Sequence, residues 1–480
     1  MDKLHIIFIA SEAAPLAKTG GLADVTGALP QALRQLGHHV TVIMPFYRLI
    51  IENSGAQINP TEHIIEMWTD GIQRHCPLHK THVNGLDYLL VEQDDLYARD
   101  AIYGSSGGAY EDNLLRYVLF DRVALEAAAL LGSKINIIHC HDWQTGMVPL
   151  LLKTQYQHHP NIAHAKTVFT IHNLAYQGIF PSEWISRLGI PSHHFNPQSF
   201  EFHHQINCMK AGIHMSDTIT TVSPTYAKEI LTSEYGCALE GFLQHHADKL
   251  TGIVNGIDMD ALDPATDTHI PANYAFGRIA GKKKCKAALQ ELCKLEISAK
   301  TPLLTLVSRL ADQKGIDLLL ANIEKWLMRG YQLVVLGSGE PHNERLLSAF
   351  AKAHPTQMYF HCGFSEALAH KIYAGGDIFL MPSRFEPCGL GQLMAMRYGN
   401  VPVARATGGL SDTIVNYPEK GATGFHFSET TPEAFDAGLE KAITIYQQAR
   451  KWSIIRSNAL KRDSSWAASA HSYATLYKQL

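Results

Sequence analysis

The sequence predicts an α/β protein built from two doubly wound halves, and three observations carry that prediction. Apolar runs of strand length recur along the chain, and most of them are nearly continuous in apolar residues. Stretches with helical apolar spacing separate these runs, and the whole pattern begins a second time near residue 300. Continuous apolar strands are typical of parallel strands that are buried on both faces. Strands that alternate with helices imply right-handed crossovers and a doubly wound sheet.

The first half opens on a short apolar run that we interpret as a strand and not as a secretion signal. The run at 6–10 is shorter than the roughly 7–15 residues of a signal core, and a serine and a glutamate follow it at once. A helix with apolar positions at 29, 33 and 36 comes next and ends at Gly37. The further strands expected in this half are HVTVIMPF (39–46), INIIHCHDW (135–143), AKTVFTIHN (165–173), DTITTVSPT (217–225) and KLTGIVNGI (249–257).

The second half follows a change of character near residue 256. Segment 257–274 is turn-rich and polar, and segment 277–292 predicts a basic, exposed helix. The strands expected after it are PLLTLVSR (302–309), YQLVVLGSG (331–339), QMYFHCGF (357–364), GDIFLMPS (376–383) and VPVARAT (401–407). The helix after the first of them carries its apolar residues on one face, at Leu319, Ile323, Trp326 and Leu327. Two such halves facing each other would form a deep cleft, which domain closure could shut off from water.

The composition restricts the class of protein. A chain of 480 residues is too long for one ordinary core, and 46% hydrophobic with 18% charged residues is typical of a globular protein. The formal net charge of −4 gives no support to nucleic acid or an anionic membrane as the main partner. No run approaches the roughly 18 apolar residues of a membrane helix. Eight cysteines without a CxxC pair favour reduced thiols in the cytoplasm over a disulfide scaffold or a zinc ribbon.

Unusual residue clusters fall where strands end, which is where ligands bind in such sheets. The first cluster is KTGGLADV (18–25). Gly20 and Gly21 permit a positive φ and close backbone approach, and the next helix would aim its free N–H groups at an anion. Lys18 could add a point charge. The alternative is an ordinary tight turn with an exposed lysine.

Two clusters end the later strands of the first half. In HDW (141–143), Asp142 could accept hydrogen bonds from ligand hydroxyls or simply cap the next helix. In IHN (171–173), His172 and Asn173 suit sugar hydroxyls, although a structural histidine fits equally well. His139 lies two residues before His141, but no third metal ligand suggests itself, so we expect no metal site. The histidine doublets at 158–159, 193–194, 203–204 and 245–246 are expected at the surface.

In the second half, SRLADQKG (308–315) offers two cations after the first strand. Arg309 and Lys314 could both reach a diphosphate, and each would contribute about 4 kcal/mol of gross Coulomb energy at an effective dielectric of 20. Solvated surface charge is the alternative. LGSGE (336–340) is a second glycine-containing strand end, and a lone GxG is weak support for a ligand.

The most informative stretch is SRFEPCGLGQL (383–393). Glu386 could bind sugar hydroxyls, and the turn Cys388, Gly389 and Leu390 would present backbone N–H groups at a helix N-terminus. ATGGLSDTI (406–414) is another double-glycine strand end, where the backbone of Thr407 and Gly408 could meet a phosphate.

Taken together, these motifs resemble those of bacterial glycogen synthases and the related plant starch synthases, which are retaining glycosyltransferases. The resemblance rests on KTGGLADV, HDWQTG, TIHNLAYQG, NGID (255–258), SRLADQKG, and MPSRFEPCGLGQL followed by ATGGLSDT, in the family's order over nearly the whole chain. It implies two Rossmann-like domains of the GT-B type facing across a cleft. The implied domains are 1–255, completed by a C-terminal helix within 456–480, and 256–455.

The resemblance also implies an activity and roles for particular residues. Glucose would pass from ADP-glucose to the non-reducing end of an α-1,4-glucan with retention of configuration, without a cofactor. By position, Lys18, Gly20 and Gly21 resemble the donor-binding loop. The other matching positions are the diphosphate clamp (Arg309, Lys314), the donor-sugar and phosphate site (Glu386, Cys388, Gly389, Leu390), the group beside the transferring glucose (His172, Asn173), a sugar-side carboxylate (Asp142) and the weaker matches Glu12, Asp24, Tyr110 and Asn255. In the wider group a second glutamate often lies eight residues after the first, and here that position is Met394.

Three rival functions make different demands on the sequence. A glucan phosphorylase of similar architecture needs a lysine that binds pyridoxal phosphate, and none is evident. A non-catalytic glycan-binding or nucleotide-sugar-binding protein could lose Lys18, Arg309, Lys314 or Glu386, and all four are present. An NAD-dependent oxidoreductase would have a regular GxGxxG after the first strand, and that pattern is absent.

Overall fold

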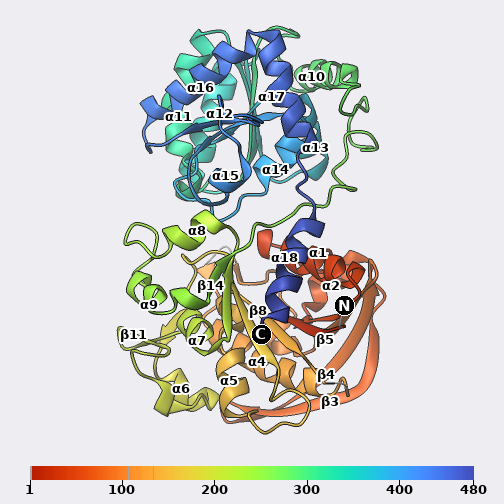
Figure 1. Cartoon of the computed structure of the whole chain (residues 1–480), viewed down its shortest axis with the longest axis vertical. Helices are drawn as coiled ribbons and strands as arrows, with labels where there is room; N and C mark the ends of the chain where they lie inside the picture. The colour runs from red at the N-terminus through yellow and green to blue at the C-terminus, as the bar shows by residue number, and fades with distance from the viewer. Residues whose placement is uncertain (1–2, 106–107, 133) are drawn as a thin grey trace. The chain divides into compact units, whose positions relative to one another are not determined.

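The computed structural model of the chain describes residues 3–105, 108–132 and 134–480. The chain forms two compact units (Figure 1). The first unit contains Met1–Val222, Ala227–Asn255 and Trp466–Leu480, and the second contains Ser223–Tyr226 and Gly256–Ser465.

The first unit is organised on a nine-stranded sheet with the strand order β14-β13-β9-β8-β1-β2-β5-β4-β3. All strands from β14 to β5 are parallel, whereas β4 and β3 continue the sheet as antiparallel strands. The strands are β1 (His5–Ile9), β2 (His39–Pro45), β3 (Asn59–Thr69), β4 (Ile72–Val83), β5 (Leu86–Val91), β8 (Ile137–His141), β9 (Lys166–Ile171), β13 (Thr218–Thr221) and β14 (Leu250–Gly252). The strand predicted at the start of the chain is confirmed as β1.

The strands β3, β4 and β5 were not predicted from the sequence. In β3 the side chains of Ile65 and Thr69 are buried, whereas Ile64 and Trp68 are exposed on the other face. Because only one face is covered, the strand mixes polar and apolar residues and lacks the continuous apolar run that marks the parallel strands.

The first unit also contains helices. They are α1 (Gly21–Gln35), α2 (Arg48–Ile51), α3 (Asp94–Tyr97), α4 (Asn113–Ala129), α5 (Val148–Thr154), α6 (Trp184–Leu188), α7 (Cys208–Met215), α8 (Pro224–Glu229, which begins in the second unit), α9 (Glu240–His245) and α18 (Trp466–Lys478). Small sheets are formed by β10 (Ile179–Pro181), β12 (Gln205–Asn207) and β11 (Glu201–Phe202), and by β6 (Gly104–Ser105) and β7 (Gly108–Ala109). The C-terminal helix α18 joins the core of this unit, since Tyr477 Oη lies 2.7 Å from His139 Nδ1.

The second unit is organised on a six-stranded parallel sheet with the order β17-β16-β15-β18-β19-β20. The strands are β15 (Leu303–Val307), β16 (Gln332–Gly337), β17 (Met358–Cys362), β18 (Ile378–Met381), β19 (Val401–Arg405) and β20 (Phe425–Phe427). The helices are α10 (Ala280–Leu292), α11 (Ile316–Met328), α12 (Pro341–Ala353), α13 (Glu366–Gly375), α14 (Gly391–Arg397), α15 (Gly408–Thr413), α16 (Pro432–Tyr446) and α17 (Ala449–Lys461). All five strands predicted for this half are present, and only the short β20 was missed.

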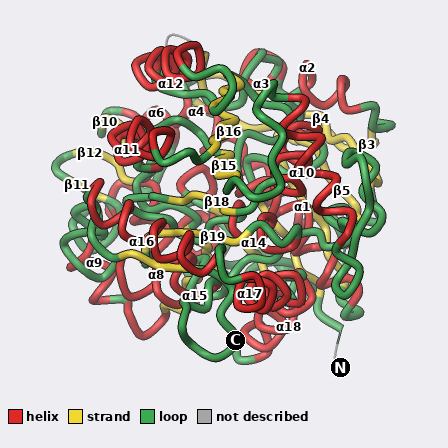
Figure 2. Tube along the Cα trace, turned by 90° about the horizontal axis from the view of Figure 1, so that it is seen from above, coloured by secondary structure: helices red, strands yellow, loops and turns green. Residues whose placement is uncertain are grey.

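Helices cover both faces of the second sheet, which explains its continuous apolar strands. In β15, Leu304 and Leu306 face a cluster with α11, α16 and α17, whereas Leu303 faces a cluster with α10, α13 and α14. Figure 2 shows β16, β15, β18 and β19 side by side in this order, with α11 and α16 on one side and α10 and α14 on the other. The doubly wound α/β class predicted from the sequence is therefore confirmed.

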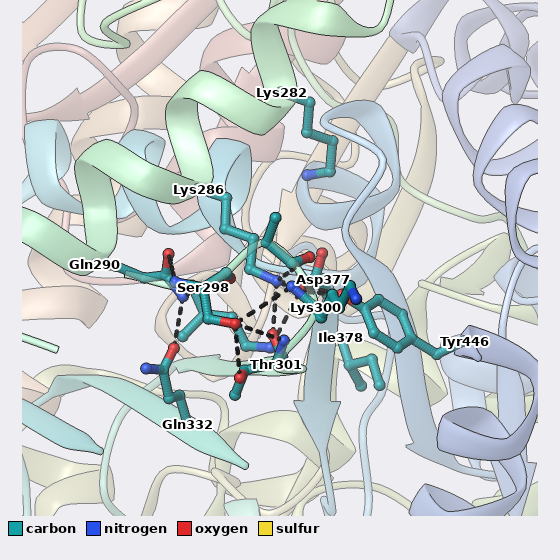
Figure 3. Close-up of polar contacts among 12 residues, drawn as sticks. Lys282, Lys286, Gln290, Ser298, Lys300, Thr301, Gln332, Asp377, Ile378 and Tyr446 are labelled. Atoms are coloured by element: carbon teal, nitrogen blue, oxygen red, sulfur yellow. Dashed lines mark hydrogen bonds and ion pairs between the residues drawn. The ribbon is translucent and has the colours of Figure 1, made fainter. Parts of the chain in front are cut away.

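The prediction that the basic helix near 277–292 is exposed holds for one face only, where Lys283 and Lys284 are exposed. In α10 the side chains of Lys282 and Lys286 are buried (Figure 3). Lys286 Nζ lies 2.7 Å from Asp377 Oδ2 and donates to Thr301 O at 2.6 Å, and Lys282 Nζ donates to Ala374 O at 3.0 Å. The lysine stems thus pack with the apolar face of the helix while each ammonium group finds oxygen acceptors.

Two further findings concern the whole chain. All eight cysteines are free thiols. Over the ranges that the structure describes, no helix is both long and apolar enough to span a membrane.

Candidate active site

Most of the predicted site residues follow the carboxyl ends of inner strands of the two large sheets, whereas Asn255 follows the edge strand β14 and Tyr110 follows β7. In the first sheet the chain turns in opposite directions from β1 and β8, so the segments after these strands, with Glu12 and Asp142, flank the switch point. In the second sheet β15 and β18 are neighbours in the same way, and their following loops carry Lys314 and Glu386. Switch points are where open α/β sheets bind ligands.

The glycine loop before α1 differs from the prediction in its backbone. Gly20 has an extended φ of −157° and a Cβ there would have nothing within 4 Å, and Gly21 is the first residue of α1. Neither glycine uses the positive φ that glycine permits. The open space beside Gly20 leaves room for a ligand near the helix N-terminus. Lys18 is half exposed, and its Nζ lies 2.6 Å from Asp24 Oδ1.

Glu12 is hydrogen-bonded to this loop through Thr19. It is 3% exposed, and its carboxylate accepts hydrogen bonds from the Thr19 backbone N–H and, at 3.0 Å, from Thr19 Oγ1. Tyr103 Oη donates to Glu12 Oε1 at 3.0 Å and lies 2.7 Å from Ser11 Oγ. Burial raises the pKa of Glu12, and these hydrogen bonds oppose the shift. Glu12 thus positions the loop that carries Lys18.

Tyr103 is a candidate site residue, because it contacts Glu12, and sequence reasoning missed it. The resemblance assigned Tyr110 instead, whose ring lies beneath the guanidinium groups of Arg99 (4.6 Å) and Arg116 (5.1 Å). The two tyrosines are connected through the backbone, because Tyr110 N donates to Tyr103 O at 3.0 Å. Nothing local in the sequence distinguishes them, since the contact with Glu12 spans 91 residues.

Asp142 connects the ends of β8 and β9. Its Oδ1 accepts the His172 backbone N–H at 2.7 Å, and its side chain makes no capping bond to the following turn η2 (Trp143–Thr145). The helix-capping alternative is therefore wrong. Burial raises the pKa of Asp142 to about 7, against the lowering effect of the His172 and Asn173 backbone N–H groups.

A row of histidines runs through the core behind this site. His139 pairs with Tyr477 Oη and, at 2.6 Å, with Thr170 Oγ1, and His141 Nδ1 lies 3.0 Å from His172 Nε2. Burial lowers the pKa of His172 to about 3, so its imidazole is neutral at physiological pH and acts as a hydrogen-bonding group. In the part of the chain that is described, no group of three His, Cys, Asp or Glu residues could hold a metal ion.

The remaining predictions for the first unit concern Asn255 and the histidine doublets. Asn255 is 7% exposed, and within the described ranges its Oδ1 has no hydrogen-bond partner. Because a buried polar atom without a partner is costly, this oxygen is a candidate ligand contact. Among the histidine doublets expected at the surface, His246 is buried, so that expectation is wrong for this residue.

In the second unit, Lys314 and Glu386 form a close ion pair. Lys314 Nζ lies 2.6 Å from Glu386 Oε2, and Ser383 Oγ donates to the same oxygen at 2.9 Å. The glutamate is 5% exposed. Both bonds fall on Oε2, so Oε1 can accept from a ligand hydroxyl, and the ammonium retains donors for a second acceptor.

The loop after β15 is fastened to the Glu386 loop. Gln313 Nε2 donates to Phe385 O at 3.2 Å, and Arg384 N donates to Gln313 O at 2.8 Å. Gly315 has φ 64°, and a Cβ there would lie 2.1 Å from Pro382 O, so only glycine fits. Arg309 is exposed, and its Nη2 is 3.4 Å from Gln313 Oε1, so its guanidinium faces solvent.

The double glycine at 408–409 packs against the Glu386 loop. A Cβ on Gly408 would lie 2.1 Å from Glu386 O, and one on Gly409 would lie 2.1 Å from Cys388 O. Gly409 N donates to Glu386 O at 3.0 Å. The backbone that was predicted to meet a phosphate here thus lies, at these two glycines, against the backbone of the Glu386 loop.

The turn at 388–390 leads into α14. Cys388 is buried, and Gly389 has φ 72°. Among the residues that the structure describes, the backbone N–H groups of Gly389 and Leu390 donate to no other group. Thr407 is buried as the residue before α15 and makes no side-chain capping bond.

Phe364 is a second candidate that sequence reasoning passed over. It follows β17, so it lies at the same edge of the sheet as the Glu386 loop, and it is 85% exposed. A phenyl ring left in solvent beside a strand end suits stacking on a planar ligand group. The sequence contained a signal for this residue, because Phe364 stands between Gly363 and Ser365 at the end of a predicted strand, where ligands bind.

Comparison with family models assigns both halves of the chain. Residues 5–245 match the model described as starch synthase catalytic domain, and residues 290–457 match the model described as glycosyl transferases group 1.

Comparison with individual proteins covers the full length. A glycogen synthase of Anaeromyxobacter dehalogenans (strain 2CP-C) is 43% identical over 479 residues, which is 99% of this chain and 100% of the relative. Glycogen synthase 2 of Geobacter sulfurreducens is 43% identical over 478 residues, with 99% and 98% covered. The catalytic domain of starch synthase IV from Arabidopsis thaliana, solved with ADP and acarbose, has a TM-score of 0.92 at 34% identity, with 100% of this chain and 99% of that chain covered.

A more distant structure shares the fold alone. Sucrose-phosphate synthase from Thermosynechococcus elongatus has a TM-score of 0.61 at 19% identity, with 99% of each chain covered.

Proposed function

This chain belongs to the family of glycogen and starch synthases, and from that membership we propose that it transfers glucose from ADP-glucose to the non-reducing end of an α-1,4-glucan. It is a retaining glucosyltransferase with the GT-B fold. The observation that carries this conclusion is the 43% identity to glycogen synthases over 99% of the chain. The same likeness favours a glycogen synthase over the phosphorylase-like and non-catalytic alternatives.

The donor's diphosphate is assigned to the loop after β15. Arg309 faces solvent, and Lys314 has donors left beyond the one that it gives to Glu386. In the proposed reaction the O4 oxygen of the terminal acceptor glucose bonds to C1 of the donor glucose, and the bond from C1 to the phosphate oxygen breaks. Negative charge then builds on the departing ADP, and these cations stabilise it as it develops.

Glu386 is assigned to the hydroxyls of the donor glucose. Its Oε2 is held by Lys314 and Ser383, which leaves Oε1 to accept from a sugar. Phe364 is assigned to the nucleotide base, because its ring is exposed beside the same strand ends. We also propose that the backbone N–H groups of Gly389 and Leu390, and the ammonium of Lys18, bind phosphate oxygens.

Retention of configuration is assigned to attack on the same face from which ADP departs. The acceptor hydroxyl then gives its proton to the departing phosphate oxygen, so that no enzyme nucleophile is required. Neither candidate carboxylate suits a nucleophile, because Glu386 is paired with Lys314 and Asp142 Oδ1 accepts the His172 N–H. A trapped glycosyl adduct on Glu386 or Asp142 would overturn this mechanism.

The direct test offers ADP-glucose and UDP-glucose separately with glycogen and measures release of the nucleotide. We expect glucan-dependent release of ADP, with turnover from UDP-glucose lower. Absence of glucan-dependent release from both donors would defeat the proposal.

Variants test the assigned residues. We expect Glu386→Gln and Lys18→Ala each to lower kcat/KM by about 100-fold, equivalent to roughly 2.7 kcal/mol of transition-state stabilisation. Glu429→Gln serves as the control for Glu386→Gln, because Glu429 is an exposed glutamate of the second unit. Full turnover by both site variants would show that the assigned site is wrong.

A further inference from the structure

Two stretches of the second unit carry cations with no acid between them. Asp267 and Glu291 are the nearest acids on either side of the first stretch, which holds five lysines and arginines. Glu440 and Asp463 bound the second stretch, which holds six. The whole chain has a formal net charge of −4, so this cationic region is a local exception. A surface of one sign attracts partners of the opposite charge.

The two stretches meet at an exposed aromatic ring. Lys461, the last residue of α17, places its Nζ 4.0 Å from the ring centre of Phe276, and Phe276 is 51% exposed. Arg278 stands two residues after Phe276 and is exposed as well. In the first turn of α10, Lys283 and Lys284 are also exposed. We call these five residues the α10 patch.

The four cations of the α10 patch differ from other cations of the second unit in having no acidic partner. Lys325 and Arg329 both pair with Asp436, and Arg384 pairs with Asp317. Within the described ranges, none of the four patch cations lies within ion-pair distance of a carboxylate. The patch therefore keeps its full positive charge for a partner.

The buried side of α10 adds to this positive charge. Lys282 and Lys286 project from the same helix (Figure 3), and Lys286 is paired with Asp377 at 2.7 Å. Burial lowers the pKa of Lys282 to about 7, and the charges of Arg456 and Lys286 act in the same direction. Three cations thus face one carboxylate on this side of the helix. An anion bound at the surface relieves part of their mutual repulsion.

We propose that the α10 patch is a docking surface for an acidic peptide segment of a partner protein. Carboxylates of the segment pair with Arg278, Lys283 and Lys284, and an apolar side chain of the segment packs on the open part of the Phe276 ring. The ring favours a peptide over a simple anion, because it offers an apolar anchor among the charges. Nucleic acid fits less well, because the net charge of the whole chain is negative.

This surface goes beyond the proposed function, because none of its residues is assigned to the donor or to the glucan. The test measures binding of a fluorescein-labelled peptide, EEDFEED, by fluorescence anisotropy at low and at physiological salt. We expect Lys283→Glu/Lys284→Glu to raise the Kd for this peptide about 10-fold or more, since two attractions become repulsions. The double variant folds, because a carboxylate in the first turn of a helix is favourable.

Phe276→Ala is the second variant, and we expect it to raise the same Kd about threefold through loss of the apolar contact. Both variants keep wild-type release of ADP from ADP-glucose. Lys352→Glu/Lys420→Glu is the matched control, because it makes the same change of net charge at exposed lysines of the same unit outside the patch. We expect this control to bind the peptide like the wild type.

Three results would overturn the docking surface. The first is that the wild-type chain does not bind the peptide at low salt. The second is an equal loss of binding in the control variant, which would show that only the net charge of the chain matters. The third is tighter binding of a single-stranded oligothymidylate through the same residues, which would assign the patch to nucleic acid instead.

Discussion

At the scale of single residues, burial shifts the pKa of two site residues in the first unit, Asp142 and His172. Asp142 is 9% exposed, and its pKa is raised to about 7, whereas the pKa of His172 is lowered to about 3. Both shifts favour the neutral form, as expected when water is removed from around an ionisable group. Near neutral pH the ends of β8 and β9 therefore offer a sugar a neutral imidazole and a carboxyl group that is partly protonated.

The raised pKa of Asp142 predicts a pH-dependent stability. Since its unfolded pKa is near 3.8, the folded chain holds one more proton than the unfolded chain between about pH 4 and pH 7. The contribution of Asp142 to the free energy of unfolding thus falls as pH rises through this window, by at most about 1.4 kcal/mol per pH unit.

Asp142→Asn removes this titration and keeps an oxygen for the His172 N–H. We therefore expect the variant to gain stability relative to the wild type between pH 5 and pH 7, measured by urea unfolding at each pH. Parallel pH profiles for the two proteins would contradict the shift.

At the scale of elements, two loops of the second unit are held together by glycines that bring their backbones into contact. A Cβ on Gly409 would lie 2.1 Å from Cys388 O, and Gly409 N donates to Glu386 O. The position of Glu386 therefore depends on the loop before α15, a relation that the sequence shows only as two separate glycine motifs.

Gly409→Ala tests this contact. We expect a loss of about 1–3 kcal/mol in the free energy of unfolding, because the methyl group overpacks the contact, and a drop in kcat as the Glu386 loop moves. Gly241→Ala in α9 is the control, since a Cβ there has nothing within 4 Å. The prediction fails if both alanine variants keep wild-type stability and turnover, as measured by urea unfolding and nucleotide release.

The helix α10 shows a second effect at this scale. Its Lys282 and Lys286 were expected in solvent, and both are buried. Lys282 donates to Ala374 O near the end of α13, and Lys286 pairs with Asp377, which precedes β18. Burial lowers the pKa of Lys282 to about 7, which is close to physiological pH.

This shift predicts a pH dependence of the opposite sign to that of Asp142. Between about pH 7 and 10.5 the unfolded chain holds the extra proton, so the contribution of Lys282 to the free energy of unfolding rises with pH. We expect Lys282→Met to lose that rise, measured as the difference between variant and wild type in urea unfolding at pH 7, 8 and 9. A difference that is independent of pH would refute the buried titration.

At the scale of the whole molecule, the C-terminal helix completes the first unit. Tyr473 and Tyr477 of α18 are buried there, and Tyr477 pairs with His139, 338 residues earlier in the chain. Ser469 Oγ donates to Val254 O at 2.6 Å in the same unit. The last residues of the chain thus belong to the core that carries the histidine row.

Substitutions at Tyr477 separate packing from hydrogen bonding. We expect Tyr477→Ala to lower the free energy of unfolding by about 3–5 kcal/mol through cavity formation. Tyr477→Phe should cost about 1 kcal/mol, the value of one hydrogen bond. Denaturant unfolding followed by circular dichroism gives both values, and equal effects would show that the ring is not packed in the core.

The sequence by itself determined the doubly wound class, the parallel strands and the motifs at their carboxyl ends. These features can be recognised in short segments of the sequence, because an apolar run or a glycine pair at a strand end involves only neighbouring residues. The family followed from the order of the motifs. The sequence did not predict the hairpin of β3 and β4. Only one face of this hairpin is buried, so its strands lack a continuous apolar run.

Only the tertiary structure decided which polar groups meet. Glu12 reaches Tyr103, Asp142 binds the His172 backbone, Lys314 pairs with Glu386, and the lysines of α10 turn inward. Each contact joins residues far apart in the chain, and its geometry depends on how strands are ordered in the sheet. Local propensity carries no information about such pairings, because the desolvation and hydrogen bonding that select them exist only once the elements have packed.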